Sequence, residues 1–331
     1  MGSLKLPDEF TLVEVGEGIH AWLAPNGSWG MSNAGLIFDG KESMIVDTMF
    51  DLPLTRSMLD SMATVVPEIR SNVDILLNTH ANGDHCHGNE LVPTNRIIAS
   101  AETAAEMGEL PPSALYAMVE SFRGDVSALG RYIQYAFGSF DFSNITMRMP
   151  TETFTKEMSV AVGDLDIKLF QVGPAHTKGD VIAYVPAHGV VFTGDILFFQ
   201  ETPIMWAGPV DNWIAACDLI ESFNAVTVPG HGPITDNSGV RDMRNYWIML
   251  RDQAKERFES GMSILEAAND IDLGPYINWG GPERVFLNVN SLYKEFGSNQ
   301  IAGDVMSLFM EMGVIWDSRC EEKDLPLVRK D

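Results

Sequence analysis

The chain has 331 residues, of which 45% are hydrophobic and 21% are charged. This is an ordinary globular balance, and it predicts a sizeable buried core rather than disorder. A net charge of −24 disfavours nucleic acid and anionic membranes as partners, because both bind clusters of Lys and Arg. The charge does not exclude a nuclease with a local basic groove, which stays a lesser alternative.

The cysteines and the N-terminal residues bear on the compartment. Cys86, Cys217 and Cys320 are odd in number and form no C-x-x-C pair, so no disulfide framework is predicted. Residues 1–10 lack the apolar segment of a signal peptide, and no stretch reaches the roughly 18 apolar residues of a spanning helix. We therefore expect a cytoplasmic protein without a membrane span, and we predict no particular oligomeric state.

The first hundred residues show strand patterns, then a helix, then a buried strand. Short alternating segments separated by Gly-containing turns predict an antiparallel meander. Its strands are expected at 10–15, 20–23, 33–38 and 43–47. Apolar spacing predicts a helix over 52–64, and the apolar run 73–77 predicts a buried strand that leads directly into Asn78-Thr79-His80.

The remaining residues repeat the alternation of strands and helices. Apolar residues every three or four positions predict helices over 101–107 and 112–137, within a helical insertion of about 101–149. Strands are then expected at 159–162, 166–170, 181–185, 190–192 and 225–228, and helices at 212–223, 240–260, 263–269, 283–296 and 302–312. This order predicts an α/β fold of two packed sheets flanked by helices, with a catalytic domain over 1–238 and a helical C-terminal region over 239–331.

Most histidines share one kind of position. Five of the seven follow a predicted strand and lie in a loop that contains Gly or Asn, namely His80, His85, His87, His176 and His231. Loops on a rigid scaffold commonly display metal ligands, and imidazole with carboxylate suits zinc, iron or manganese. Each histidine alone is more often a solvated residue than a ligand, but together they predict a metal site.

The segment Thr79 to His85, THANGDH, resembles the H-x-H-x-D-H motif of the metallo-β-lactamase superfamily. Three later landmarks follow in the family's order: His176 in VGPAHT, Asp195 in FTGD and His231 in VPGHG. Asp47 matches the family's early aspartate at a strand end, although a turn residue would also fit there. The resemblance covers about residues 10–233 and implies the family's four-layer αβ/βα sandwich.

The resemblance also implies two metal positions. The first would be held by His80, His176 and a bridging Asp195, with Asn82 standing where the family usually has a second histidine. The second would be held by Asp84, His85, His231 and Asp195. Because an amide oxygen suits zinc less well than imidazole, we expect one or two zinc ions of unequal affinity, with iron or manganese as alternatives.

Three further residues are candidates for the substrate pocket. His87 stands where the family usually has a small residue, so it is a possible extra ligand, a substrate contact or simply a capping histidine. Trp29 and Trp206 lie in loops that flank the predicted site, and each is either a pocket residue or a packed aromatic side chain.

The expected chemistry follows from the metal. A bound divalent ion polarises a carbonyl oxygen and lowers the pKa of its water to about 7, so that hydroxide is available near neutrality. Asp84 or Asp195 is expected to orient that water and move its proton. We predict a hydrolase of a small lactone, ester, thioester or amide. A non-haem diiron redox enzyme on the same fold and an inactive binding module are the alternatives.

Overall fold

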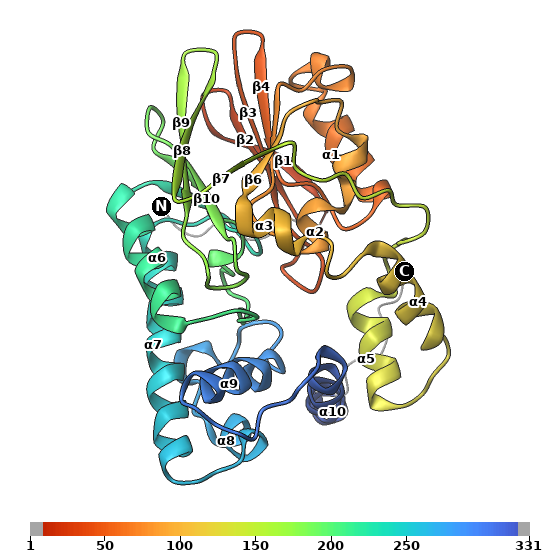
Figure 1. Ribbon diagram of the computed structural model, residues 1–331, viewed down its shortest axis with the longest axis vertical. Helices are drawn as coiled ribbons and strands as arrows, with labels where there is room; N and C mark the ends of the chain where they lie inside the picture. Colours follow the sequence, from red (N-terminus) through yellow and green to blue (C-terminus); the bar gives the residue numbers. More distant parts are fainter. Residues whose placement is uncertain (1–8, 324–331) are drawn as a thin grey trace.

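The computed structural model describes residues 9–323 as two β-sheets packed face to face, with helices on both outer faces (Figure 1). The first sheet has the strand order β1-β2-β3-β4-β5-β6-β7, and the second has the order β12-β11-β10-β9-β8. Strands β1 to β4 pair antiparallel, and β4 to β7 pair parallel. The predicted four-layer αβ/βα sandwich is therefore confirmed.

The strands are short, as expected where turns of Gly and Asp separate alternating apolar residues. Those of the first sheet are β1 (Thr11–Gly16), β2 (Ile19–Leu23), β3 (Ala34–Asp39), β4 (Glu42–Val46), β5 (Ile75–Leu77), β6 (Ile97–Ser100) and β7 (Glu152–Phe154). Those of the second sheet are β8 (Glu157–Val162), β9 (Leu165–Gln171), β10 (Val181–Val185), β11 (Val190–Phe192) and β12 (Val226–Val228). The sequence patterns did not predict β6 or β7, each of which has only three or four residues.

Helices cover the sheets and extend beyond them. The α-helices are α1 (Leu52–Met62), α2 (Gly83–Cys86), α3 (Ala101–Glu106), α4 (Pro112–Ser121), α5 (Ala128–Phe137), α6 (Val210–Phe223), α7 (Asn237–Glu259), α8 (Ile264–Asp270), α9 (Arg284–Glu295) and α10 (Val305–Lys323). The 3-10 helices are η1 (Pro67–Arg70), η2 (His87–Leu91), η3 (Gly194–Ile196) and η4 (Gly274–Tyr276). No helix within residues 9–323 has the length and apolar character that crossing a membrane requires.

The helical insertion differs from the prediction in one respect. The expected helix over 112–137 is two helices, α4 and α5, separated at residues 122–127. Gly124 has φ +76, and Ser127 begins the second helix by accepting a hydrogen bond from the backbone N–H of Gly130. A glycine followed by an N-capping serine ends one helix and begins another.

Hydrophobic clusters lie between the sheets and on both outer faces. Side chains of alternate strand residues, such as Ile37, Ile75 and Val181, fill the space between the sheets. The outer face of the first sheet packs against Met58 and Met62 of α1. The antiparallel and parallel strands thus bury the apolar faces that their sequences predict.

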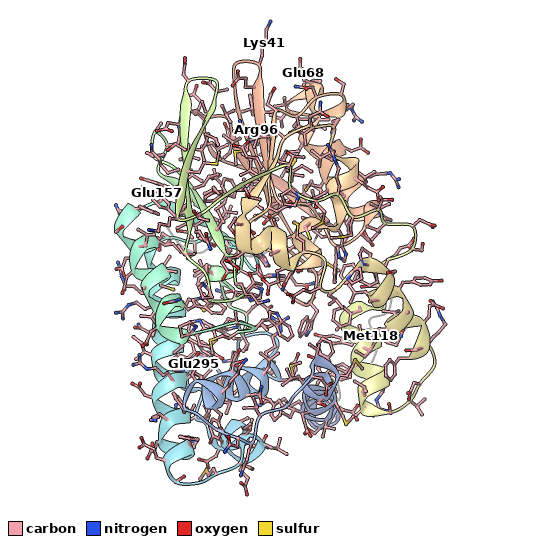
Figure 2. All side chains as sticks on the ribbon, in the orientation of Figure 1. Lys41, Glu68, Arg96, Met118, Glu157 and Glu295 are labelled. Carbon is pink, nitrogen blue, oxygen red and sulfur yellow. The ribbon has the colours of Figure 1, made fainter. Side chains whose placement is uncertain are left out.

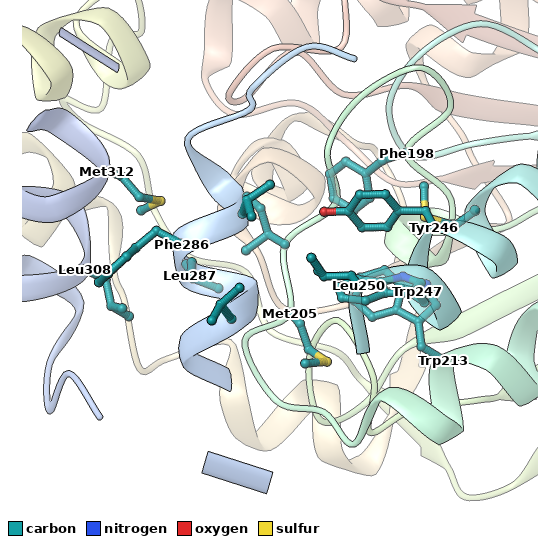
Figure 3. Close-up of a cluster of buried hydrophobic side chains, with 14 of the residues drawn as sticks. Phe198, Met205, Trp213, Tyr246, Trp247, Leu250, Phe286, Leu287, Leu308 and Met312 are labelled. Atoms are coloured by element: carbon teal, nitrogen blue, oxygen red, sulfur yellow. The ribbon is translucent and has the colours of Figure 1, made fainter. Parts of the chain in front are cut away.

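The C-terminal helices share a hydrophobic cluster with the second sheet's helical layer. Trp213 of α6, Trp247 of α7 and Leu287 of α9 belong to it, and Figure 3 shows Leu308 and Met312 of α10 beyond α9 in the same cluster. Figure 1 shows α4, α5, α9 and α10 at one end of the sandwich, which is also the end where α2 lies. Helix α2 carries Asp84 and His85, so the candidate metal ligands lie at this end.

Candidate metal centre

The candidate site is assembled from loops that adjoin neighbouring strands. β5 ends at Leu77 and leads to His80 and α2, while β11 ends at Phe192 and leads to Asp195 in η3. β12 ends at Val228, three residues before His231, and His176 lies in the loop that precedes β10. Loops at one edge of a packed sheet can bring side chains together that are far apart in sequence.

Four imidazoles converge on the carboxylate of Asp195. Its Oδ2 lies 3.6 Å from Nε2 of His80, 3.4 Å from that of His176 and 3.3 Å from that of His231. Its Oδ1 lies 3.1 Å from Nε2 of His85. All four rings therefore present the same nitrogen atom to one buried carboxylate, as expected if Asp195 lies between two metal positions.

Asp84 adds a second carboxylate on one side of this cluster. Its Oδ2 lies 3.4 Å from Nε2 of His231 and 3.7 Å from Nε2 of His85. Two groups have ligand atoms close enough together to hold one ion each: His80, His85 and Asp195 form one, and Asp84, His85 and His231 form the other. The second group contains three of the four residues expected at the second position, without Asp195, whereas the first group has His85 in place of the expected His176.

The other ring nitrogen of each histidine has a hydrogen-bond acceptor. Nδ1 of His80 contacts Thr79 Oγ1 at 2.9 Å, and the Thr79 hydroxyl in turn donates to Asp47. Nδ1 of His85 contacts the Asp47 carboxylate at 2.9 Å. The carbonyls of Ile204 and Met31 accept from Nδ1 of His176 and His231, respectively. These contacts place the proton on Nδ1 and leave the Nε2 lone pair directed into the cluster.

The residues present fit a bound cation. Nε2 of His80, Nε2 of His85 and Oδ1 of Asp195 are buried without a hydrogen-bond partner among the described residues. Buried polar atoms of folded proteins are normally satisfied, and an ion at this point would satisfy all three. Imidazole and carboxylate form a donor set suited to zinc, iron or manganese, and the metal's identity stays a prediction.

The carboxylates of the cluster also favour a positive charge beside them. Burial acts to lower the pKa of His231, but Asp195 and Asp84 outweigh it and raise that pKa to about 9. The pKa of His85 is likewise raised, against the effect of burial, by Asp195, Asp84 and Asp47. Burial alone would raise the pKa of Asp84, yet His85 and His231 lower it to about 2. The carboxylates thus stabilise a positive charge, which a metal ion would supply in place of these protons.

Asn82 lies beside the cluster and contacts His176. Its Nδ2 is 3.0 Å from Nε2 of His176, the atom whose lone pair faces Asp195. The amide therefore competes with any metal for that lone pair, unless its oxygen is turned toward the ion. This contact gives a structural reason for a weaker first position, and the ligand role of Asn82 stays a prediction.

Gly230 makes the close approach of Asp195 possible. A Cβ atom at residue 230 would lie 2.0 Å from Asp195 Oδ1 and 2.7 Å from the carbonyl carbon of Gly194. No side chain larger than hydrogen fits there without moving the carboxylate. The glycine of the VPGHG segment thus has a steric role directly beside the metal centre.

The cluster lies at the floor of a pocket of about 420 Å³, a size typical of small-molecule sites. Asn82, Asp84, His176, Asp195 and His231 contribute to its lining. The structure places Trp29 and Trp206 in its wall as well, and their contact with substrate stays a prediction. Further wall residues come from α4 and α5, within the helical insertion 101–149 that we expected to shape the pocket, and from α10, in the C-terminal region to which the sequence assigned no definite role.

His87 does not contribute to the pocket lining among the described residues. Its ring packs against Phe50 and Phe142, with centroid distances of 5.6 and 6.3 Å, and it lies under Gly83. Burial lowers its pKa to about 4, so it is neutral near pH 7. His87 is thus a buried, packed residue and not a surface histidine, and its ligand and substrate roles stay predictions.

Cys86 is also buried, and its thiol donates to the carbonyl of Asn82 at 3.3 Å. Burial raises the pKa of this thiol, so it has little thiolate character and no nucleophilic role is indicated.

Some functional contacts could not be recognised in the sequence. The carbonyls of Met31 and Ile204 act through backbone atoms, so their residue types carry no signal. Arg284 lies on α9, far from every motif, yet its guanidinium lies in the pocket wall 4.8 Å from the Trp29 ring. The PER segment at the start of α9 gave no indication of this contact.

Solved structures with the same fold are distant in sequence. A sec-alkylsulfatase from Pseudomonas sp. superposes with a TM-score of 0.64 at 16% identity, over 87% of this chain and 50% of that one. The chain thus spans about half the length of the alkylsulfatase. A metallo-beta-lactamase from Pontibacter korlensis superposes with a TM-score of 0.52 at 16% identity, over 72% of this chain and 99% of that one.

No curated protein matches the sequence significantly. The family model of the metallo-beta-lactamase superfamily matches residues 27–232, which is more than half of the chain and includes every predicted metal ligand. Together with the fold and the imidazole–carboxylate cluster, this match shows that the chain belongs to the metallo-beta-lactamase superfamily.

Proposed function

We propose that the chain is a zinc-dependent hydrolase that cleaves a carbonyl-type bond, in a lactone, ester, thioester or amide, of a small organic substrate. The observation that carries the proposal is the convergence of four Nε2 atoms and two carboxylates at the floor of a pocket. Membership of a superfamily that uses divalent metals supports a metal-dependent hydrolase in general terms. The carbonyl substrate and the zinc are the finer parts of the proposal.

Two overlapping ligand sets would hold the metal. His80, His176 and Asp195, with Asn82 beside them, form the first, and Asp84, His85, His231 and Asp195 form the second. When bound, a divalent ion supplies Lewis acidity toward a carbonyl oxygen and lowers the pKa of water to about 7.

The two carboxylates have different surroundings and therefore different proposed roles. Asp195 is 3% exposed and surrounded by imidazoles, which suits a fixed ligand. Asp84 is 9% exposed and lines the pocket, so it can reach a water molecule beside the substrate. His85 and His231 keep Asp84 ionised, and a carboxylate in this position can orient that water and pass its proton onward.

The test is a screen of esters, lactones, thioesters and β-lactams with metal-replete protein, repeated after chelation. The proposal predicts hydrolysis that is lost with chelator and restored by zinc. Failure of metal-replete protein to hydrolyse any carbonyl substrate, or hydrolysis that chelator leaves unchanged, would contradict it. Iron in place of zinc, together with redox activity, would favour the diiron alternative.

A second candidate, hydrolysis of sulfate esters, is favoured by Arg284. This side chain is 1% exposed and lies in the pocket wall, and its Nε has no hydrogen-bond partner among the described residues. A guanidinium matches the oxygens of an anionic group such as sulfate. The fold shared with a sec-alkylsulfatase adds a reason to include alkyl sulfates in the screen, with sulfate release as the readout.

A further inference from the structure

The wall of the pocket above the metal centre is mainly apolar and comes from separate parts of the chain. Leu115 and Met118 belong to α4, Phe137 belongs to α5, and Met306 and Phe309 belong to α10. Met118, which belongs to α4, is labelled in Figure 2. Helix α10 lies outside the residues that match the superfamily model, so this part of the wall is an addition to the family's shared core.

Helix α10 is held against the pocket by specific contacts. The Phe309 ring lies 5.6 Å from Phe137 and 5.8 Å from Trp29, measured between centroids. Further along the helix, Trp316 stacks on Tyr135 of α5 at 4.7 Å, and Asp317 pairs with Arg131 of the same helix. These contacts make α10 a fixed wall rather than a loose tail.

The charged groups that line the pocket are confined to the metal centre, to Glu106 and Glu109, and to Arg284. Asp84 and Asp195 are at the floor, where the metal ligands gather. Glu106 and Glu109 also line the pocket, and both lie within 3.3 Å of Lys178, where ion pairs hold them. Apart from Arg284, the described residues that line the pocket between these groups are mostly apolar or aromatic. Such a wall binds an apolar group and disfavours a strongly charged one.

We propose that the substrate is an ester with a medium-length apolar acyl chain, which α4, α5 and α10 enclose while its carbonyl group faces the metal centre. The inference rests on the proposed hydrolase function and names its substrate class. In the reaction the acyl C–O bond breaks: water supplies the hydroxyl group of the carboxylic acid, and its remaining proton goes to the departing alcohol. Helix α10 is then a specificity element.

The first experiment compares p-nitrophenyl esters with acyl chains of two to eight carbons on the metal-replete protein. Each buried methylene strengthens binding about fourfold. If half of the six added methylenes are enclosed, kcat/KM rises about sixtyfold from acetyl to octanoyl. A flat or falling series would overturn the inference and leave the hydrolase function standing.

The second experiment places a charge in the wall. Met306→Glu introduces a carboxylate on a partly buried pocket residue, and Met310→Glu makes the same change on the same helix at a residue that is 51% exposed and outside this pocket. We expect Met306→Glu to lower kcat/KM for the octanoyl ester at least tenfold more than it lowers kcat/KM for the acetyl ester. Met310→Glu should leave both unchanged. Equal effects of the two variants on the octanoyl ester would overturn the role of α10.

A binding measurement separates the inference from the proposed function. Should no ester be hydrolysed, the affinities of octanoate and butyrate are compared by calorimetry, since their head groups are identical. Octanoate binding at least tenfold tighter, with the difference lost in Met306→Glu, would support the apolar pocket even though carbonyl hydrolysis had failed. Equal affinities would overturn it.

Discussion

Asp47 and His85 are 38 residues apart in the chain and are joined by a hydrogen bond of 2.9 Å between Asp47 Oδ2 and His85 Nδ1. The same carboxylate accepts from the backbone N–H and the hydroxyl of Thr79, each at 2.7 Å. Thr79 in turn contacts Nδ1 of His80. One buried aspartate, with φ +64, thereby orients two candidate metal ligands.

Replacing Asp47 tests whether its hydrogen bonds to His85 and Thr79 orient the candidate metal ligands. Asp47→Asn keeps the size of the side chain but replaces one carboxylate oxygen with an NH2 group. Because that group is a donor, it cannot accept the hydrogen bonds from Thr79 or His85 that the oxygen accepts. We expect metal affinity to fall about 10- to 100-fold, measured by competition with a chromogenic chelator. The control is Asp60→Asn at the exposed ion pair with Arg70. Equal affinity in the wild type and Asp47→Asn would show that this carboxylate does not position the ligands.

Gly230→Ala tests the steric requirement beside Asp195. The added methyl group would overlap the Asp195 carboxylate, so we expect loss of metal affinity of at least about tenfold, as when an orienting contact is removed. Gly108→Ala is the matched control, because a Cβ there meets nothing within 4 Å. If both variants retain wild-type metal content and circular dichroism, the close approach of residues 195 and 230 has no functional importance.

Asn82→His tests the weaker of the two metal positions. Asn82 now contacts His176 through its amide nitrogen, and a histidine would offer a ring nitrogen to the metal instead. We therefore expect the variant to retain more zinc than the wild type at the same chelator concentration. Turnover should fall if Asn82 orients substrate or water. An unchanged stoichiometry would mean that other groups already complete the first coordination shell.

His231→Ala and Asp84→Ala test the second position. Each variant removes one predicted ligand of this position, and the two side chains contact each other, with Oδ2 of Asp84 3.4 Å from Nε2 of His231. Loss of even an outer contact can cost 100-fold, so we expect hydrolysis to fall at least about 100-fold in each variant. His188→Ala, in the turn between β10 and β11, is the control histidine. Near-normal turnover in either test variant would assign catalysis to the other position.

The sequence predicted the layers of the fold and most of its elements. Strands such as 181–185 and helices such as 52–64 have the alternation or the three-to-four spacing that burial on one face requires. β6 and β7 were missed because strands of three or four residues carry too little pattern. Residues 122–127 interrupt the helix predicted over 112–137. Gly124 and Ser127 are residue types that commonly end and begin helices, so this interruption could have been predicted.

The candidate site was predictable only in part. Its histidines and aspartates fall in recognisable motifs, so their grouping could be expected from the sequence. The hydrogen bonds to Ile204 and Met31 depend on backbone carbonyls, which every residue type has. Phe309 and Arg284 reach the pocket through the packing of α9 and α10, which depends on tertiary contacts far from any motif.

We infer that the imidazole–carboxylate cluster holds a catalytic transition metal. The most direct measurement is elemental analysis of the protein after metal-supplemented expression, combined with hydrolysis assays before and after chelation. We expect one to two metal ions per chain, mainly zinc, and activity that is lost when the metal is removed and recovered when it is returned. Less than about 0.2 metal ions per chain would contradict this inference, because such ligand sets normally bind zinc tightly.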